Sequence, residues 1–360
     1  MKVLHILRSP RAEGTVKLAL DWLSEQDLQQ EVFALYPEPA EMTESLRARA
    51  AWYGQGRGLS RNATKYPWIL FNVWGVCVQR RPDLVICWAN GFAPRVLIGA
   101  WLAGVPRLIT HAGNPPTWTA WGKLQTLIST FTTWITGGRM VCCSHYVASE
   151  FARSPGSFAS VLRMVYNCAP VLSVREEAAQ ARAQRKDRHP QLIMVATLES
   201  HKDHATLLKA MPAVIRAVPG VQLCLAGDGS QRNRLQSLSS SLGLTDVVTF
   251  LGSRRDVPAL LGQSDVFVLS TTPEEGLGTV LIEALAAGLP VVASDVPACR
   301  EALAGGRWGV LVPPADPEAL ATALISSLQT RDFAEASERS DYLQQFSPAR
   351  MIAAYLAAAS

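Results

Sequence analysis

Residues 273–290 read PEEGLGTVLIEALAAGLP, and this stretch decides the fold more than any other. An apolar strand pattern ends near Ser270, a loop with two glycines follows, and a helical pattern then runs to Gly288, with Pro290 after it. Loop glycines let backbone amides approach a ligand closely, and a helix N-terminus favours an anion such as a diphosphate. The stretch therefore predicts a strand–loop–helix unit with an anion site.

Two carboxylates accompany that site, Glu275 in the loop and Glu283 about one turn into the helix. Carboxylates beside a phosphate are repulsive unless they have another task, and the hydroxyls of a sugar supply one. An ordinary strand–loop–helix with solvated acids explains the glycines equally well. The neighbouring motifs decide between the two interpretations.

Short apolar strands alternate with helical patterns on both sides of this stretch, which predicts an α/β protein with parallel sheets. A polar segment, 175–189, interrupts the alternation and marks a domain boundary; it is predicted to be either a short helix or a mobile connection. Two such domains would place a ligand cleft between them, at the carboxyl ends of the strands. The expected divisions are a first domain at 1–170, a linker at 171–190, a second domain at 191–345 and a separate C-terminal helix at 346–360.

Composition excludes several classes of protein. Hydrophobic residues make up 48% and charged residues 18% of the 360, which is typical of globular domains with large cores. No apolar run reaches the roughly 20 residues that span a bilayer, so we expect a cytoplasmic protein. The seven cysteines form no C-x-x-C pair, and His201 and His204 have no second ligand pair at metal spacing. We expect neither a disulfide framework nor a metal site.

Further motifs stand in register with residues 273–290: ATLESHKDH at 196–204, LAGDG at 225–229, VTFLG at 248–252 and SDVFVLS at 264–270. In order and spacing, the region 190–315 closely resembles the retaining GT-B glycosyltransferases of family four, the glycosyl transferases group 1. The first half resembles them weakly. The resemblance implies two Rossmann-like domains facing a central cleft, with a C-terminal helix that crosses back to the first domain.

The resemblance also implies roles for individual residues. Glu275 would bind hydroxyls of the donor sugar, Glu283 would hold the ribose, and Lys202 would neutralise the departing diphosphate. Backbone amides in the glycine loop would hold sugar and diphosphate; they belong to Gly276, Leu277, Gly278 and Thr279.

The weaker resemblance of the first half places Gly14 in the family's glycine-rich loop. It implies that His111 contacts the donor sugar, so that Glu275, Lys202 and His111 form the catalytic set. One departure concerns Thr197, which stands in the donor site where the family usually has an arginine. Arg254 or its neighbour Arg255 is a candidate for the missing cation.

The implied reaction is transfer of a hexosyl group from a UDP- or GDP-sugar to a hydroxyl of a glycan or lipid-linked glycan, with retention and without a metal or other cofactor. Such a reaction would serve surface-polysaccharide or glycolipid assembly. No Asp-x-Asp metal motif occurs in the chain. Two alternatives stay open: another GT-B sugar-nucleotide enzyme, or a non-catalytic nucleotide-sugar-binding subunit, which Thr197 favours.

Residues 45–149 carry eleven basic residues against one acid, Asp83, and eight of the ten tryptophans. Core tryptophans with a basic solvated surface explain most of these individually. An aromatic acceptor groove is a second interpretation. A third is peripheral docking on an anionic membrane, at the inner face of the cytoplasmic membrane, through a helix that bears Trp118, Trp121 and Trp134. Nucleic acid is not expected, because no recognition motif accompanies the dispersed charges.

Overall fold

The computed structural model describes the chain except residues 12–13, 25–27, 39, 57–65, 187–188 and 331–335. It divides into two compact units. Unit 1 comprises Met1–Cys168 together with Pro348–Ser360, and unit 2 comprises Ala169–Ser347. The C-terminal helix α15 (Pro348–Ala359) therefore belongs to the first unit, although it follows the second in sequence.

Unit 1 is built on a seven-stranded parallel sheet in the order β3-β2-β1-β4-β5-β6-β7. The strands are β1 Lys2–Leu7, β2 Gln29–Ala34, β3 Trp52–Gln55, β4 Leu84–Cys87, β5 Arg107–Ala112, β6 Arg139–Cys142 and β7 Leu162–Met164. Its other helices are α1 Gly14–Trp22, α2 Thr43–Arg49, α3 Tyr66–Arg80, α4 Ala93–Leu102, α5 Ala120–Ile135 and α6 His145–Arg153.

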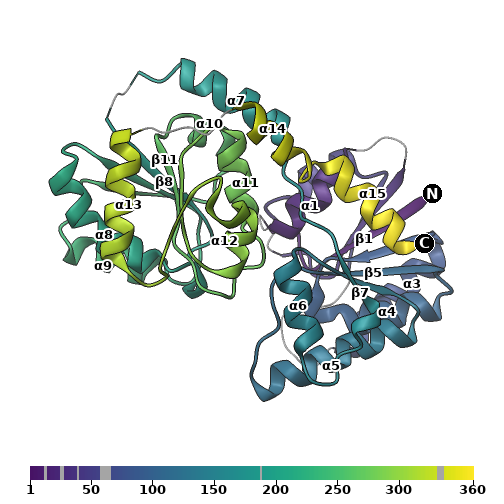
Figure 1. Cartoon of the computed structure of the whole chain (residues 1–360). Helices are drawn as coiled ribbons and strands as arrows, with labels where there is room; N and C mark the ends of the chain where they lie inside the picture. Colours follow the sequence, from purple (N-terminus) through teal and green to yellow (C-terminus); the bar gives the residue numbers. More distant parts are fainter. Residues whose placement is uncertain (12–13, 25–27, 39, 57–65, 187–188, 331–335) are drawn as a thin grey trace. The chain divides into compact units, whose positions relative to one another are not determined.

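The sheet of unit 1 has a separate core on each face. Alternate side chains of β1 divide between them, Val3 and Leu7 into one and Leu4 and Ile6 into the other. Helices α1 and α15 cover the first face, while α3 and α4 cover the second (Figure 1). Burial on both faces explains why these strands read as continuous apolar runs.

Unit 2 contains a six-stranded parallel sheet in the order β10-β9-β8-β11-β12-β13. The strands are β8 Gln191–Val195, β9 Gln222–Ala226, β10 Val248–Gly252, β11 Val266–Leu269, β12 Val291–Ser294 and β13 Val310–Val312. The helices are α7 Val171–Ala183, α8 His204–Ala217, α9 Arg232–Ser241, α10 Val257–Gly262, α11 Thr279–Ala286, α12 Pro297–Ala302, α13 Pro317–Thr330 and α14 Ala336–Gln344.

The predicted alternation of strands and helices is confirmed in both units. Four elements were missed, namely α2, β3, β7 and α14, because each carries too few apolar residues in a regular pattern to stand out. The segment predicted as a linker, 171–190, contains α7, so the structure has the helix of the two possibilities, and α7 packs on α10 and α11 of unit 2. Residues 187–188 of that segment lie outside the described residues.

Strand order reverses between β8 and β11 in unit 2 and between β1 and β4 in unit 1. The loops after the two strands at such a point diverge and leave room for a ligand at the carboxyl edge of the sheet. In unit 2 these are the loop that leads to Lys202 and the loop that contains Glu275. The topology therefore explains why two motifs some seventy residues apart in sequence meet.

Candidate functional site

The loop after β8 holds Lys202 at the entrance to α8. Ser200–Lys202 form a single 3-10 turn, and Asp203 then adopts a left-handed conformation with φ 36°. The Asp203 side chain accepts a hydrogen bond from the Thr206 amide at 3.3 Å and so caps α8. A cap at the strained position fixes where the turn ends and the helix begins, and therefore where Lys202 projects.

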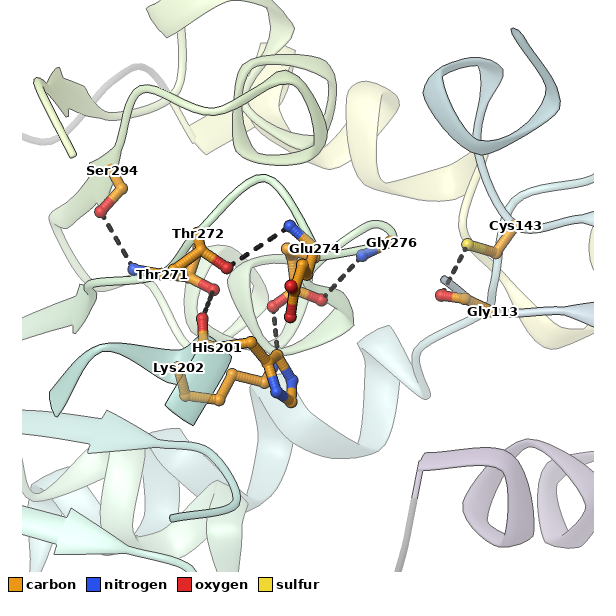
Figure 2. A network of polar contacts seen from close by, with 10 residues as sticks. Gly113, Cys143, His201, Lys202, Thr271, Thr272, Glu274, Gly276 and Ser294 are labelled. Atoms are coloured by element: carbon orange, nitrogen blue, oxygen red, sulfur yellow. Dashed lines mark hydrogen bonds and ion pairs between the residues drawn. The ribbon is translucent and has the colours of Figure 1, made fainter. Parts of the chain in front are cut away.

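The loop after β11 is tied to that turn by backbone hydrogen bonds (Figure 2). The His201 carbonyl accepts from the Thr272 amide at 3.0 Å and from the Thr271 hydroxyl at 2.9 Å. The Thr271 amide in turn donates to the Ser294 hydroxyl at the end of β12, at 3.0 Å. These bonds connect the ends of β8, β11 and β12, so the two loops form one rigid group.

Lys202 and Glu275 form an ion pair across the two loops. Their side chains are only 16% and 8% exposed, so water screens the pair weakly. The Gly276 amide also donates to the Glu275 carboxylate, at 3.1 Å. Burial alone would raise the pKa of Glu275, but the charge and hydrogen bond of Lys202 and the Gly276 amide outweigh it and hold that pKa below its usual value. Glu275 is therefore an ionised, buried acceptor.

Helix α11 begins immediately after this carboxylate. Its N-cap is Gly278, which has φ 72° and makes no side-chain cap. A Cβ at Gly278 would lie 3.0 Å from the Leu281 side chain, so the position suits only glycine. Because the N-cap glycine offers no side-chain acceptor, the first amides of the helix and the positive end of its dipole favour an anion there. Glu283, one turn on, is buried.

The glycine-aspartate-glycine turn at 227–229 packs directly on the loop after β8. A Cβ at Gly227 would stand 1.9 Å from the Ala196 carbonyl oxygen, so only glycine permits this approach. The Leu198 amide donates to the Asp228 carbonyl at 3.1 Å. Glu199 accepts from the Ser230 hydroxyl at 2.6 Å. The motifs that the sequence placed in register thus lie in contact around one loop.

Three other residues were predicted to contact the donor: Thr197, Arg254 and Gly14. Thr197 is exposed in the loop after β8. Arg254 is exposed and engaged by Asp256, with its Nε donating to the carboxylate at 2.8 Å. Gly14 begins α1 of unit 1, and within the described part of the chain no atom beyond its neighbours and its own helix backbone lies within 4 Å of the place a Cβ would take.

His111 lies at the end of β5 in unit 1 and is 1% exposed. Its Nδ1 shares a 2.7 Å hydrogen bond with the Tyr355 hydroxyl of α15, while its Nε2 is buried without a hydrogen-bond partner among the described residues. The Trp88 ring lies 5.1 Å away, centroid to centroid. Burial lowers the pKa of His111 to about 4, so the imidazole is neutral at physiological pH.

Sequence reasoning missed Tyr355, Thr271 and Ser294 as partners of the site residues. Each is a common residue type whose role depends on a contact formed by the fold. The loop that follows His111 is held in a similar way, since the Cys143 thiol donates to the Gly113 carbonyl at 3.3 Å (Figure 2). Within the described ranges, no three His, Cys, Asp or Glu side chains gather as a metal site requires.

A solved structure with the same architecture decides the fold. Anabaena Alr3699/HepE in complex with UDP-glucose superposes with a TM-score of 0.84 at 21% identity, covering 99% of both chains. This is the GT-B fold. Residues 175–343 match the family model of the glycosyl transferases group 1.

Two curated relatives are similar in sequence. One is a GDP-mannose-dependent alpha-(1-6)-phosphatidylinositol monomannoside mannosyltransferase of Mycobacterium tuberculosis, 29% identical over 71% of this chain and 69% of that protein. The other is a phosphatidyl-myo-inositol mannosyltransferase of Mycobacterium leprae, 40% identical over 36% of this chain and 35% of its own length. This second match therefore spans about a third of the relative. Together the comparisons show the GT-B fold and a second unit that resembles the glycosyl transferases group 1.

Proposed function

We propose that the protein transfers a hexosyl group from a nucleoside-diphosphate sugar to a hydroxyl of a glycan or lipid-linked glycan, with retention of anomeric configuration. The observation that carries the proposal is the buried Lys202–Glu275 pair beside the bare N-terminus of α11, at the reversal of strand order in unit 2. The Lys202 ammonium and the helix amides can bind a diphosphate, and the Glu275 carboxylate can accept hydrogen bonds from sugar hydroxyls.

The leaving group is stabilised by fixed positive groups. As the bond between the anomeric carbon and the diphosphate oxygen breaks, its electron pair goes to the nucleoside diphosphate. Lys202 then stabilises the growing charge. Its ammonium has three N–H groups, and Glu275 accepts one of them. Groups held in place before the reaction need no reorganisation when that charge forms, so they contribute strongly to the rate. Lys202 and the helix amides, rather than a metal ion, supply this stabilisation.

Glu275 and Glu283 orient the donor. An ionised carboxylate only accepts hydrogen bonds, and hydroxyls of the hexose and the ribose are donors of suitable length. The acceptor hydroxyl attacks the anomeric carbon from the face that the diphosphate leaves, and its proton passes to the departing phosphate. For His111 we propose a neutral imidazole whose unpartnered Nε2 hydrogen-bonds a sugar hydroxyl.

Only the similar proteins restrict the choice of donor and acceptor. The matched mycobacterial enzyme is named for GDP-mannose and a phosphatidylinositol mannoside, and the matched structure holds UDP-glucose. We therefore propose a UDP- or GDP-hexose as donor, and a lipid-linked acceptor at the inner face of the cytoplasmic membrane for glycolipid or surface-polysaccharide assembly. A thermal-shift screen of UDP- and GDP-sugars identifies the donor, since a bound ligand stabilises the folded state.

A second candidate is a nucleotide-sugar-binding subunit without catalytic activity, favoured by Thr197 in place of an arginine. Donor hydrolysis by the purified chain separates the two. An active enzyme releases nucleoside diphosphate, and Glu275→Ala abolishes this release while the adjacent, exposed Glu274→Ala leaves it within about twofold of wild type. Donor binding without release by the wild type would establish the subunit. Equal release by wild type and Glu275→Ala would overturn the site.

A further inference from the structure

Helix α5 exposes large apolar side chains and buries small ones, which is the opposite of an ordinary surface helix. The residues it buries are Gly122, Thr126, Thr130, Thr132 and Thr133. The residues it exposes are large and apolar: Trp121 65%, Leu124 43%, Ile128 43%, Phe131 42%, Trp134 51% and Ile135 55%. They recur at intervals of three and four and so form one stripe. A helix that folded only against its own domain would place these side chains inward.

Threonines can occupy the buried side of α5 because their hydroxyls are hydrogen-bonded within the helix. Thr130 donates its hydroxyl to the Thr126 carbonyl at 2.9 Å, and Thr133 donates to the Ser129 carbonyl at 2.7 Å. Their polar groups are thus satisfied within the helix, so burial carries little penalty and the small side chains allow close packing. The outward stripe stays exposed even though Phe131 and Trp134 contact the Phe158 ring.

Helix α3 repeats the arrangement. Ile69, Val73 and Cys77 face the core, while four large apolar residues on the other side are exposed: Trp68 60%, Phe71 59%, Trp74 44% and Val78 46%. The exposed positions again recur at three- and four-residue spacing. No acidic residue occurs in α3, in α4 or in α5.

The three helices lie in one layer, because α4 packs against both α3 and α5. At Gly99 of α4 a Cβ would lie 2.6 Å from the Leu70 carbonyl, so the backbones of α3 and α4 are in close contact. At the end of α4, Trp101 and Leu102 are 50% and 55% exposed. We name these exposed apolar residues of α3, α4 and α5 the aromatic layer. Soluble monomers rarely expose so many large apolar side chains on neighbouring helices.

Charge around the layer is positive. Lys123 is exposed within the α5 stripe, Arg107 and Arg81 are exposed near the ends of α4 and α3, and Asp83 is the single acid between residues 45 and 149. Three of the eleven basic residues, Arg57, Arg61 and Lys65, lie outside the described residues. A basic rim attracts an anionic partner. Two copies of this face would repel each other, because both rims are positive.

We infer that the aromatic layer is the surface by which the protein docks on an anionic lipid bilayer, with α3 and α5 lying in the plane of the headgroups. Tryptophan prefers that interface, and basic residues gain there from anionic headgroups. Among the described residues no helix is long and apolar enough to cross a bilayer. The inference deepens the proposed function and rests on it for one point, that the acceptor is lipid-linked.

The test is flotation of the full-length protein with two kinds of vesicle, phosphatidylcholine alone and phosphatidylcholine with about 30% phosphatidylglycerol. We expect binding to the anionic vesicles that weakens with salt. The triple variant Trp68→Ala, Phe71→Ala and Trp121→Ala should lower binding at least about tenfold. Leu172→Ala is the matched control, because Leu172 of α7 is 72% exposed but lies in unit 2.

Charge is tested separately by Lys123→Glu, which should weaken binding to anionic vesicles about fivefold or more, since a basic residue near the headgroups contributes ~1 kcal/mol. The control is Lys209→Glu, on an exposed position of α8, which should have no such effect. Thermal stabilisation by the nucleotide sugar should be unchanged in all these variants, because none of them lies in the donor site.

Three results would overturn the inference: no vesicle binding by the wild type, equal binding by the triple variant and wild type, or a wild-type dimer that the triple variant dissociates. The last would show that the layer pairs two copies. If any of these occurred while donor stabilisation and donor hydrolysis persisted, the docking surface alone would fail. If no nucleotide sugar stabilised the wild type against thermal unfolding, the proposed function itself would fail.

Discussion

Glu275 in unit 2 and His111 in unit 1 are both buried at the carboxyl edge of a parallel sheet, but they are held by opposite means. A neighbouring ammonium and a backbone amide stabilise the charge of Glu275 and lower its pKa. Among the described residues His111 is held by the phenol of Tyr355 and the indole ring of Trp88, and burial keeps it neutral. The ion pair suits a ligand that carries charge, and the neutral imidazole suits one that offers hydroxyls.

The largest expected effect comes from removing the cation of the first pair. Lys202→Met should lower turnover about a hundredfold to a thousandfold, because the leaving group loses its fixed positive partner. It should also cost about 3 kcal/mol of stability, since a buried carboxylate is left unpaired. Steady-state kinetics and urea denaturation measure the two effects. Lys209→Met, on the exposed side of α8, is the control.

The double variant Lys202→Met with Glu275→Gln sharpens this result. Replacing both charges removes the unpaired carboxylate, so stability should return toward that of wild type while activity stays low. If activity returned together with stability, the pair would only stabilise the fold. It would then have no part in the reaction.

Acid should weaken the folded state through its neutral histidines. Burial lowers the pKa of His5, His111 and His204 to about 4 from an ordinary 6.5. The unfolded chain binds protons at these sites between those values and the folded chain does not, so stability falls as the pH drops from 6.5 toward 4. Going from pH 7 to pH 5 should cost about 2 kcal/mol per histidine.

Urea denaturation at the two pH values measures that loss. His204 has two ring nitrogens without a hydrogen-bond partner among the described residues, so His204→Leu should remove its share of the acid sensitivity at little cost at pH 7. Acid sensitivity equal to that of wild type would show that His204 is not neutral in the folded protein. Glu275 acts in a lower range, because its depressed pKa gives stability that is lost only below about pH 4.5.

Tyr355→Phe tests how His111 is held. The variant leaves the buried Nδ1 without a partner and should cost about 1–2 kcal/mol of stability. Nitrogen NMR of the ring should show a changed tautomer balance at His111. Tyr342→Phe is the control: its hydroxyl donates to the Ala302 carbonyl at 2.9 Å in unit 2, so it should leave the His111 signal unmoved. An unchanged signal in Tyr355→Phe would show that packing alone sets the ring.

The smallest effect is expected at Arg254. Its guanidinium is exposed and shares its charge with Asp256, so Arg254→Ala should change turnover less than about threefold. A loss of tenfold or more would instead make it the cation that replaces the family's arginine. Donor affinity, measured by thermal shift, distinguishes the two outcomes.

The residues that sequence reasoning predicted well are those whose identity follows from local backbone chemistry. Gly278 is a helix start with positive φ, and the motif around Gly227 requires a close backbone approach, so both leave a signature within a few residues. Order and spacing of such signatures predicted the GT-B fold. Parallel sheets in both units followed from the alternation of apolar runs and helical patterns, but β3 and β7 at the two edges of the seven-stranded sheet did not.

The residues that it missed depend on contacts between distant segments. Tyr355 reaches His111 across 244 positions, and no local pattern marks either as a partner. The reversed burial of α5 was also hidden, because an apolar stripe has the same spacing whether it faces the core or the solvent. The charges of α7 left both a short helix and a mobile connection open, although Val174, Ala178 and Ala181 form the buried stripe of a helix.

The membership of α15 in unit 1 has a consequence for synthesis. Residues 1–168 leave the ribosome first, but the core that contains Trp22 and Val141 is completed by Met351, Ile352 and Tyr355, which follow the whole of unit 2. Unit 2 has all its elements available earlier and can fold while the first 168 residues still lack a helix. The half of the molecule that is made first is therefore the half that is finished last, and a chain interrupted before residue 348 would expose that core to chaperones.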